Sequence, residues 1–142
     1  QGKPFSREAA MPNTLQQSVV LPATPARLYA MYLNSKIHAA ITGEPAKIGR
    51  KRGTAFRAFD GTLTGTILQT VPGKLIVQSW RTSHWKKGDL DSTLIIAFYD
   101  DARGSRIQLV HVNVPDHDYK GVKDGWHTYY WKPWRRYLKD RA

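Results

Sequence analysis

The sequence contains no cysteine among its 142 residues, and it contains no long apolar run. The first absence excludes a disulfide framework, a thiol nucleophile and cysteine-ligated zinc or iron–sulfur sites. The second excludes a membrane helix, which needs roughly 18 consecutive apolar residues. We therefore expect a soluble chain without membrane insertion. Its compartment is unknown, with the cytoplasm favoured over export.

Acidic residues are scarce relative to basic ones. Eleven Asp and Glu stand against 22 Lys and Arg, which gives a formal net charge of +11. Such a balance is typical of proteins that meet a polyanion, an anionic membrane surface or an acidic protein. The cations gather over residues 47–57, 81–87 and 132–141. Each of these clusters is either a binding surface or a solvated face.

Motifs for cofactors and metals are missing too. No Gly-rich phosphate loop occurs, which argues against a nucleotide cofactor. His111, His117 and His127 match no ligand spacing such as two histidines one helical turn apart. We expect no cofactor and no metal site.

What is present suits one domain. A chain of 142 residues fits one core and is too short for two. Hydrophobic residues make up 41% of the chain, and they include five Trp, seven Tyr and four Phe. We assign residues 15–142 to a single domain of unknown oligomeric state. Residues 1–14 are expected to form a flexible N-terminal segment, left by a cleaved tag or by processing; the alternative is that Met11 marks the native start.

Two short helices are predicted after a first strand over residues 15–21. Thr24 is a candidate N-cap, and Pro25 suits the first helical position. Ser35 is expected to cap a second helix through residue 40, which Gly43 closes in a left-handed conformation. The two helices therefore lie almost end to end.

Residues 45–114 show the pattern of antiparallel strands joined by tight turns. The turn signals are Asp60-Gly61 for a two-residue turn, Pro72-Gly73 for a type II turn, and residues 101–105. Gly65 is expected to allow close backbone packing inside a strand. With the first strand and the weak segment 46–49, the sheet has about seven strands.

A long C-terminal helix is predicted over residues 121–141. On a helical wheel Trp126, Tyr129, Tyr130, Trp134 and Tyr137 fall within about 80° of one another, so this stripe must cover the sheet. Pro133 removes the hydrogen bond to the Tyr129 carbonyl and should bend the helix. The predicted fold is α+β, a curved antiparallel sheet wrapped around a terminal helix.

Several segments resemble, in order, one known family. They are FDGTLTGTILQTVPGKLIVQSWR (59–81), DSTLIIAF (91–98), IQLVHVNVP (107–115) and GWHTYYWKPWRRYL (125–138). The chain is similar over residues 16–138 to the activator of heat-shock protein 90 ATPase homologue family, within the START and birch-pollen-allergen-like superfamily. The resemblance implies a helix-grip fold. It also implies three functions to weigh: ligand binding, co-chaperone-like protein interaction and polyketide cyclase-like catalysis.

The first hypothesis is a non-enzymatic domain whose internal cavity binds a small hydrophobic or aromatic ligand. The expected lining residues are Phe56, Gln78, Trp80, Trp85, Phe98, His111, Trp126 and Tyr130. Strand alternation points Trp80 inward and Arg81 to solvent, while Trp85 lies at the rim. The alternative for Trp80 is plain core packing beneath the helix.

A catalytic role depends on His111, which alternates with apolar residues and should point inward. A buried histidine can act as a general base when a partner tunes its pKa. Only Asp91, Tyr130 and Gln78 are candidate helpers, and no spacing joins them to His111. We therefore assign no catalytic residues, and enzymatic activity stays uncertain and disfavoured.

The basic exterior supports the other binding hypothesis. The cations of the terminal helix, which form a candidate surface for an acidic protein partner, are Lys132, Arg135, Arg136 and Lys139. Nucleic acid is the main rival partner, because cations bind phosphates and aromatics stack on bases. The aromatic side chains are predicted to face inward, however, so no specific nucleic-acid binding is expected.

Overall fold

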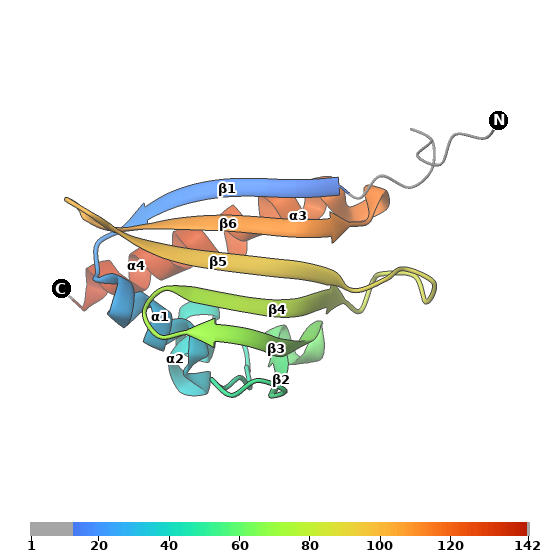
Figure 1. The fold of residues 1–142 in the computed structure, drawn as a ribbon, viewed down its shortest axis with the longest axis horizontal. Coiled ribbons are helices and arrows are strands. Elements are labelled where there is room, and N and C mark those ends of the chain that lie inside the picture. Colours follow the sequence, from blue (N-terminus) through green and yellow to red (C-terminus); the bar gives the residue numbers. More distant parts are fainter. Residues whose placement is uncertain (1–12, 142) are drawn as a thin grey trace.

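The computed structural model describes residues 13–141, in which six strands form one antiparallel sheet (Figure 1). The elements are β1 (Asn13–Leu21), α1 (Pro25–Leu33), α2 (Ser35–Thr42), β2 (Ala55–Ala58), β3 (Leu63–Val71), β4 (Leu75–Thr82), β5 (Ser92–Asp101), β6 (Gly104–Val114), α3 (Tyr119–Gly125), the π-helical segment η3 (Trp126–Trp131) and α4 (Lys132–Asp140). Short 3₁₀ turns, η1 (Phe59–Gly61) and η2 (Asp116–Asp118), precede β3 and α3. The sheet order is β1-β6-β5-β4-β3-β2.

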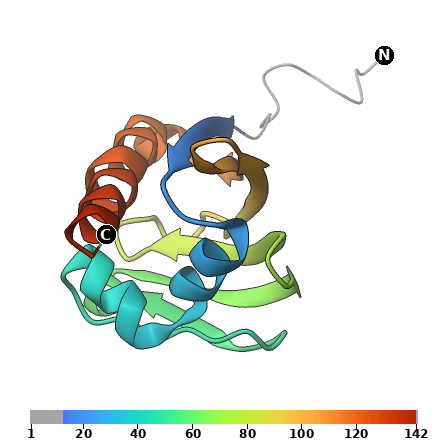
Figure 2. The same cartoon turned by 90° about the vertical axis from the view of Figure 1, so that its left-hand side faces the viewer.

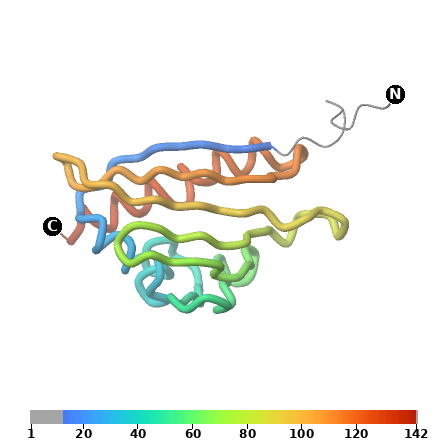
Figure 3. The backbone as a smooth tube through the Cα atoms, viewed as in Figure 1, coloured from blue at the N-terminus to red at the C-terminus, as the bar shows by residue number. Residues whose placement is uncertain are grey.

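The sheet curves around the terminal helix, which confirms the predicted helix-grip architecture. The helix formed by α3, η3 and α4 runs across one face of the sheet, and α1 and α2 lie near its C-terminal end (Figures 1 and 2). The first strand lies beside the last one, at the sheet edge (Figure 3). In β4 the inward side chains of Ile76, Gln78 and Trp80 are buried, as alternation predicts.

One expected strand is not part of this sheet. The segment 46–49 makes only an isolated bridge, in which Lys47 and Arg57 exchange two backbone hydrogen bonds of 2.8 Å. The expected flexible segment 1–14 falls mostly outside the described residues. Its last two residues, Asn13 and Thr14, belong to β1 and pair with β6.

The N-cap of α1 is the residue that the sequence predicts, whereas the N-cap of α2 is a different one. Thr24 caps α1 as predicted, since its Oγ1 accepts a hydrogen bond from the Arg27 N–H at 3.2 Å. The cap of α2 is Asn34, whose Oδ1 accepts from the Ile37 N–H at 2.9 Å. Ser35 instead bonds both the N–H and the carbonyl of Ile48, so it holds the following loop against the helix.

The hairpin turns lie where the sequence places them. Lys74 N–H donates to the Val71 carbonyl at 2.9 Å, and Gly73 has φ of 71°, as a type II turn requires. The connection at residues 59–62 is longer than the predicted two-residue turn, because Phe59 and Asp60 also take left-handed conformations. Gly65 packs so closely on β4 that an added Cβ would lie 1.9 Å from the Ser79 carbonyl oxygen.

The terminal helix departs from the simple wheel in its middle. Lys132 N–H donates to the His127 carbonyl, an i→i+5 bond that defines the π segment just before Pro133. Five-residue spacing therefore brings Trp126 and Trp131 onto one side, with stacked rings 5.4 Å apart. Trp131, which the wheel left off the buried stripe, is buried, whereas Tyr129 is 57% exposed.

Candidate functional site: a cavity between helix and sheet

A cavity of about 480 Å³ lies between the terminal helix and the β3–β4 end of the sheet. Its floor is made of buried side chains, chiefly Trp80 from β4 and Trp126 and Tyr130 from η3. Exposed side chains, including Glu44 and Tyr129, stand at its mouth. The volume lies within the roughly 300–1,000 Å³ typical of small-molecule pockets.

The floor is a continuous aromatic surface. The rings of Trp80 and Trp126 are 6.2 Å apart at 31°, and Trp126 and Tyr130 are 4.8 Å apart at 37°. These tilted contacts are within the usual range for aromatic pairs. Trp80 Nε1 is buried without a hydrogen-bond partner among the described residues. The floor therefore offers an apolar aromatic surface.

Tyr130 is positioned by His38, a residue that the sequence analysis did not single out. His38 Nδ1 donates to the Tyr32 carbonyl at 2.7 Å, which leaves Nε2 to accept from the Tyr130 hydroxyl at 2.8 Å. Burial lowers the pKa of His38 to about 4, so it is neutral near pH 7. The sequence feature that could have identified His38 is its i, i+3 spacing from Ile41, which places both side chains on one face of α2.

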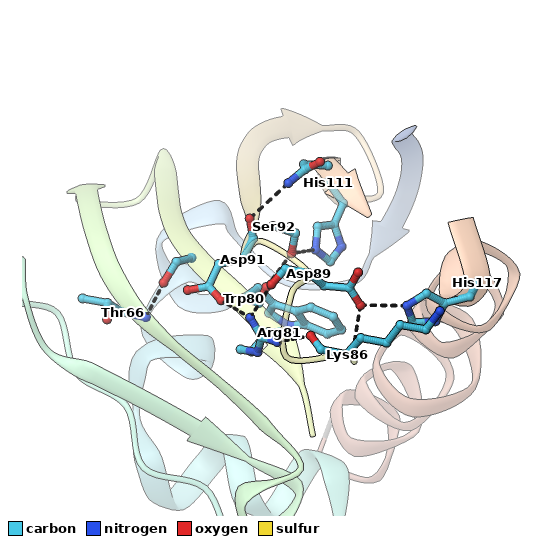
Figure 4. Close-up of polar contacts among 11 residues, drawn as sticks. Thr66, Trp80, Arg81, Lys86, Asp89, Asp91, Ser92, His111 and His117 are labelled. Atoms are coloured by element: carbon cyan, nitrogen blue, oxygen red, sulfur yellow. Dashed lines mark hydrogen bonds and ion pairs between the residues drawn. The ribbon is translucent and has the colours of Figure 1, made fainter. Parts of the chain in front are cut away.

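His111 supports Trp126 and is itself bonded to Ser92, as Figure 4 shows for the second contact. Trp126 Nε1 donates to His111 Nδ1 at 3.3 Å, and His111 Nε2 donates to Ser92 Oγ at 2.8 Å. Ser92 in turn donates to the Trp80 carbonyl at 2.6 Å. Burial lowers the pKa of His111 to about 3. Both ring nitrogens are engaged within the protein, so neither is free for a substrate in this arrangement.

The other predicted lining residues are buried in the core and do not line this cavity; besides Trp85 and His111 they are Phe56, Gln78 and Phe98. Gln78 accepts a 2.6 Å hydrogen bond from Tyr32, and its Nε2 has no partner among the described residues. Phe56 packs beside His38, and Phe98 meets Tyr29 edge to face. Of the three suggested helpers of His111, none hydrogen-bonds to it: Gln78 and Tyr130 bond elsewhere, and Asp91 pairs with Arg81.

Hydrogen bonds and ion pairs hold the tryptophan- and lysine-rich loop after β4 in one conformation. Arg81, expected to meet solvent freely, donates to the Asp89 and Lys86 carbonyls at 3.0 and 3.1 Å and pairs with Asp91 at 2.7 Å (Figure 4). His117 donates to Asp89 at 2.8 Å, and this bond is the main cause of the lowered pKa of Asp89. The contacts fix the loop beside η2.

Trp85 lies inside this loop and not at the rim as predicted. Trp85 is only 6% exposed, and its ring centroid lies 5.7 Å from that of Trp80. Its Nε1 donates to Asp118 Oδ2 at 2.8 Å, which joins the loop to the start of α3. Through this contact between Trp85 and Trp80, the loop packs against the cavity floor.

The predicted basic surface is exposed as expected. Lys132, Arg136 and Lys139 project from α4, and no carboxylate of residues 13–141 pairs with them. Arg135 differs, because its guanidinium donates to the Val20 carbonyl of β1 at 3.0 and 3.3 Å. Arg135 therefore attaches the helix to the edge strand, while the other three cations are free to meet a partner.

Two other kinds of site were sought in the part of the chain that the structure describes. Over residues 13–141, no group of three His, Asp or Glu side chains is arranged to hold a metal ion. In the same range, no helix has both the length and the apolar character to cross a membrane. The cavity and the basic face of α4 are thus the candidate sites.

The family is settled by comparison with known proteins. A family model described as Activator of Hsp90 ATPase homolog 1-like protein matches residues 22–139. The chain belongs to this family. The human Activator of 90 kDa heat shock protein ATPase homolog 1 is 28% identical over 109 residues, which cover 77% of this chain and 32% of the human protein. The chain spans roughly a third of the length of such curated relatives.

Solved structures share the fold of this family member. An HSP90 activator from Plasmodium falciparum superposes with a TM-score of 0.78 at 19% identity, covering 89% of this chain and 96% of that one. A protein from Mesorhizobium loti superposes with a TM-score of 0.79 at 16% identity, covering 92% and 99%. At such identities the likeness establishes architecture only.

Proposed function

We propose that the domain binds a small hydrophobic or aromatic ligand in the cavity between its terminal helix and its sheet. The carrying observation is the cavity of about 480 Å³ above the aromatic floor of Trp80, Trp126 and Tyr130. Large side chains on the helix do not fill this space. Hydrogen bonds that Tyr130 and Trp126 donate to His38 and His111 hold the floor rings in place, so the site is preorganised.

Blocking the cavity is a sharper test than removing its floor. Trp80 packs on Trp85, His111 and Trp126, so its truncation would also weaken the core. Gly125 lines the cavity with a helical φ of −61°, and a Cβ added there meets nothing closer than Tyr129 at 3.5 Å. Gly125→Leu therefore introduces a large apolar side chain at the cavity wall, from a position where its Cβ has room.

The experiment measures the thermal midpoint of the domain against a library of small aromatic compounds. A ligand that binds only the native state raises the midpoint by mass action. We expect a rise that Gly125→Leu abolishes and that His127→Leu, on the exposed side of the same helix, leaves intact. Equal rises in both variants, or no rise with any compound in the unmodified chain, would refute ligand binding in this cavity.

A second function, docking on an acidic protein surface, is supported by the free cations of α4 and by the names of the curated relatives. Its test is charge reversal at Lys132, Arg136 and Lys139, with Arg135 left in place because it contacts Val20. We expect weaker, more salt-sensitive binding to a 90 kDa heat shock protein. The exposed Lys51→Glu is the matched control, and an equal loss in that variant would exclude a role specific to α4.

A further inference from the structure

The walls of the cavity differ in charge from the rest of the molecule. The chain carries 22 Lys and Arg against 11 Asp and Glu, yet no lysine or arginine is among the residues that line the cavity. Two carboxylates line it, those of Glu44 and Asp118. The cavity is therefore a local negative region within a strongly positive protein, and low-dielectric walls concentrate such a field.

These two carboxylates are not neutralised within the protein. Glu44, just after α2, is exposed and makes no ion pair with residues 13–141. Asp118 accepts one hydrogen bond, from Trp85 at its Oδ2, and makes no side-chain cap to α3. Its Oδ1 has no hydrogen-bond partner among the described residues. Both carboxylates have unused acceptor capacity toward a ligand.

The floor beneath them suits the same kind of ligand. The faces of Trp, Tyr and Phe rings attract a cation, with Trp the strongest, and enclosures of such rings recognise organic ammonium groups. Trp80, Trp126 and Tyr130 supply three rings with centroids 4.8 to 6.2 Å apart for consecutive pairs. An anion would meet repulsion from the two carboxylates.

We propose that the cavity selects a small organic cation, an ammonium group on an aromatic or apolar body. The inference rests on the proposed ligand-binding function and specifies the charge of the ligand. The apolar body would lie on the aromatic floor, and the ammonium group would lie within reach of Glu44 and Asp118. The abundant lysines and arginines outside the cavity would attract anions to the exterior and not into this site.

The test uses three probes that share a benzene ring and differ in charge: benzylamine, benzyl alcohol and benzoate. Affinities are measured by calorimetry in about 0.15 M salt, where long-range attraction to the basic exterior is screened. We expect benzylamine to bind about tenfold more tightly than benzyl alcohol, since cation–π and partly exposed ion-pair contacts together supply roughly 1.4 kcal/mol. Benzoate should bind most weakly.

Two nearly isosteric variants locate the selectivity. Glu44→Gln and Asp118→Asn should each lower benzylamine affinity about threefold and leave benzyl alcohol affinity unchanged. Asp118→Asn keeps an amide oxygen to accept the Trp85 N–H. Asp140→Asn is the matched control, because it removes one exposed negative charge from α4, away from the cavity. It should leave all three affinities unchanged.

The outcomes separate this inference from the function it specifies. Equal binding of benzylamine and benzyl alcohol, with both lost in Gly125→Leu, would overturn cation selection and keep a neutral-ligand cavity. A benzylamine preference that survives the combined Glu44→Gln and Asp118→Asn changes would overturn the assigned carboxylates. If none of the three probes bound, cation selection would be overturned. The thermal-midpoint screen with the wider aromatic library would then show separately whether the cavity binds any ligand.

Discussion

Two buried histidines should make the domain lose stability in mild acid. His38 and His111 are each at least 99% buried and are held neutral in the folded state, with pKa values of about 4 and about 3. In the unfolded chain both regain the ordinary pKa near 6.5. Because the folded pKa values are depressed, protons bind the unfolded state preferentially as the pH falls below 6.5. Stability is therefore full above that pH and is lost on acidification.

The size of the loss follows from the same pKa values. At pH 5 an unfolded histidine is protonated 1.5 pH units below its pKa, which favours unfolding by about 2 kcal/mol at 1.36 kcal/mol per unit. Neither folded histidine binds an appreciable proton fraction there, so the two together remove about 4 kcal/mol. The pKa values of Asp89, Asp101 and Asp124 are also lowered, but these carboxylates affect the unfolding free energy only at lower pH. Between pH 7 and 5 the change in stability therefore comes from the two histidines.

The assay is urea unfolding at closely spaced pH values between 7 and 5. His38→Gln and His111→Gln should each reduce the loss of unfolding free energy over this interval by about half, whatever their effect at pH 7. His127→Gln, on the exposed side of the helix, should leave it unchanged. If the double variant lost as much stability on acidification as the unmodified chain, the buried neutral histidines would not be the cause.

Two further predictions concern the fold. Gly65→Ala places a Cβ 1.9 Å from the Ser79 carbonyl oxygen and should lower the unfolding free energy by about 3 kcal/mol or more, whereas Gly88→Ala, with open space around it, should change it little in the same denaturation assay. Asn34→Ala removes the cap of α2 and should lower the unfolding free energy by about 1 kcal/mol; an unchanged unfolding free energy in the denaturation assay would contradict the assigned cap.

The fold was predictable because local chemistry agrees with the global architecture. Pro25 and Thr24 mark where α1 begins, and Pro72-Gly73 marks the β3–β4 turn, through dihedral preferences that act within a few residues. The π segment was not predictable in this way. Pro133 indicates a disturbed helix, but the i→i+5 register that brings Trp131 onto the buried side is selected by packing against the sheet.

The candidate site was predictable in part. Trp80, Trp126 and Tyr130 follow from strand alternation and helical period, and all three line the cavity. The polar residues that hold them were missed, because His38 and Ser92 come from different elements and meet their partners only through tertiary contacts. Charge around the cavity could not be read from the sequence either, since Glu44 and Asp118 lie 74 residues apart and come together only in the fold.

The open space above the aromatic floor has a specific structural origin. Gly121 and Gly125 are four residues apart on α3, so they share one helical face, and both line the cavity. Glycine within a helix is less stable than alanine by about 1 kcal/mol at each position. At Gly125 an added Cβ meets nothing closer than Tyr129 at 3.5 Å, so a larger side chain there would be expected to stabilise the helix and to occupy the space, whereas at Gly121 an added Cβ would lie 2.5 Å from Asp118 Oδ1 and would displace that carboxylate. The same pair of glycines that weakens α3 therefore keeps the cavity accessible, which links the stability of this helix directly to the proposed binding of a ligand.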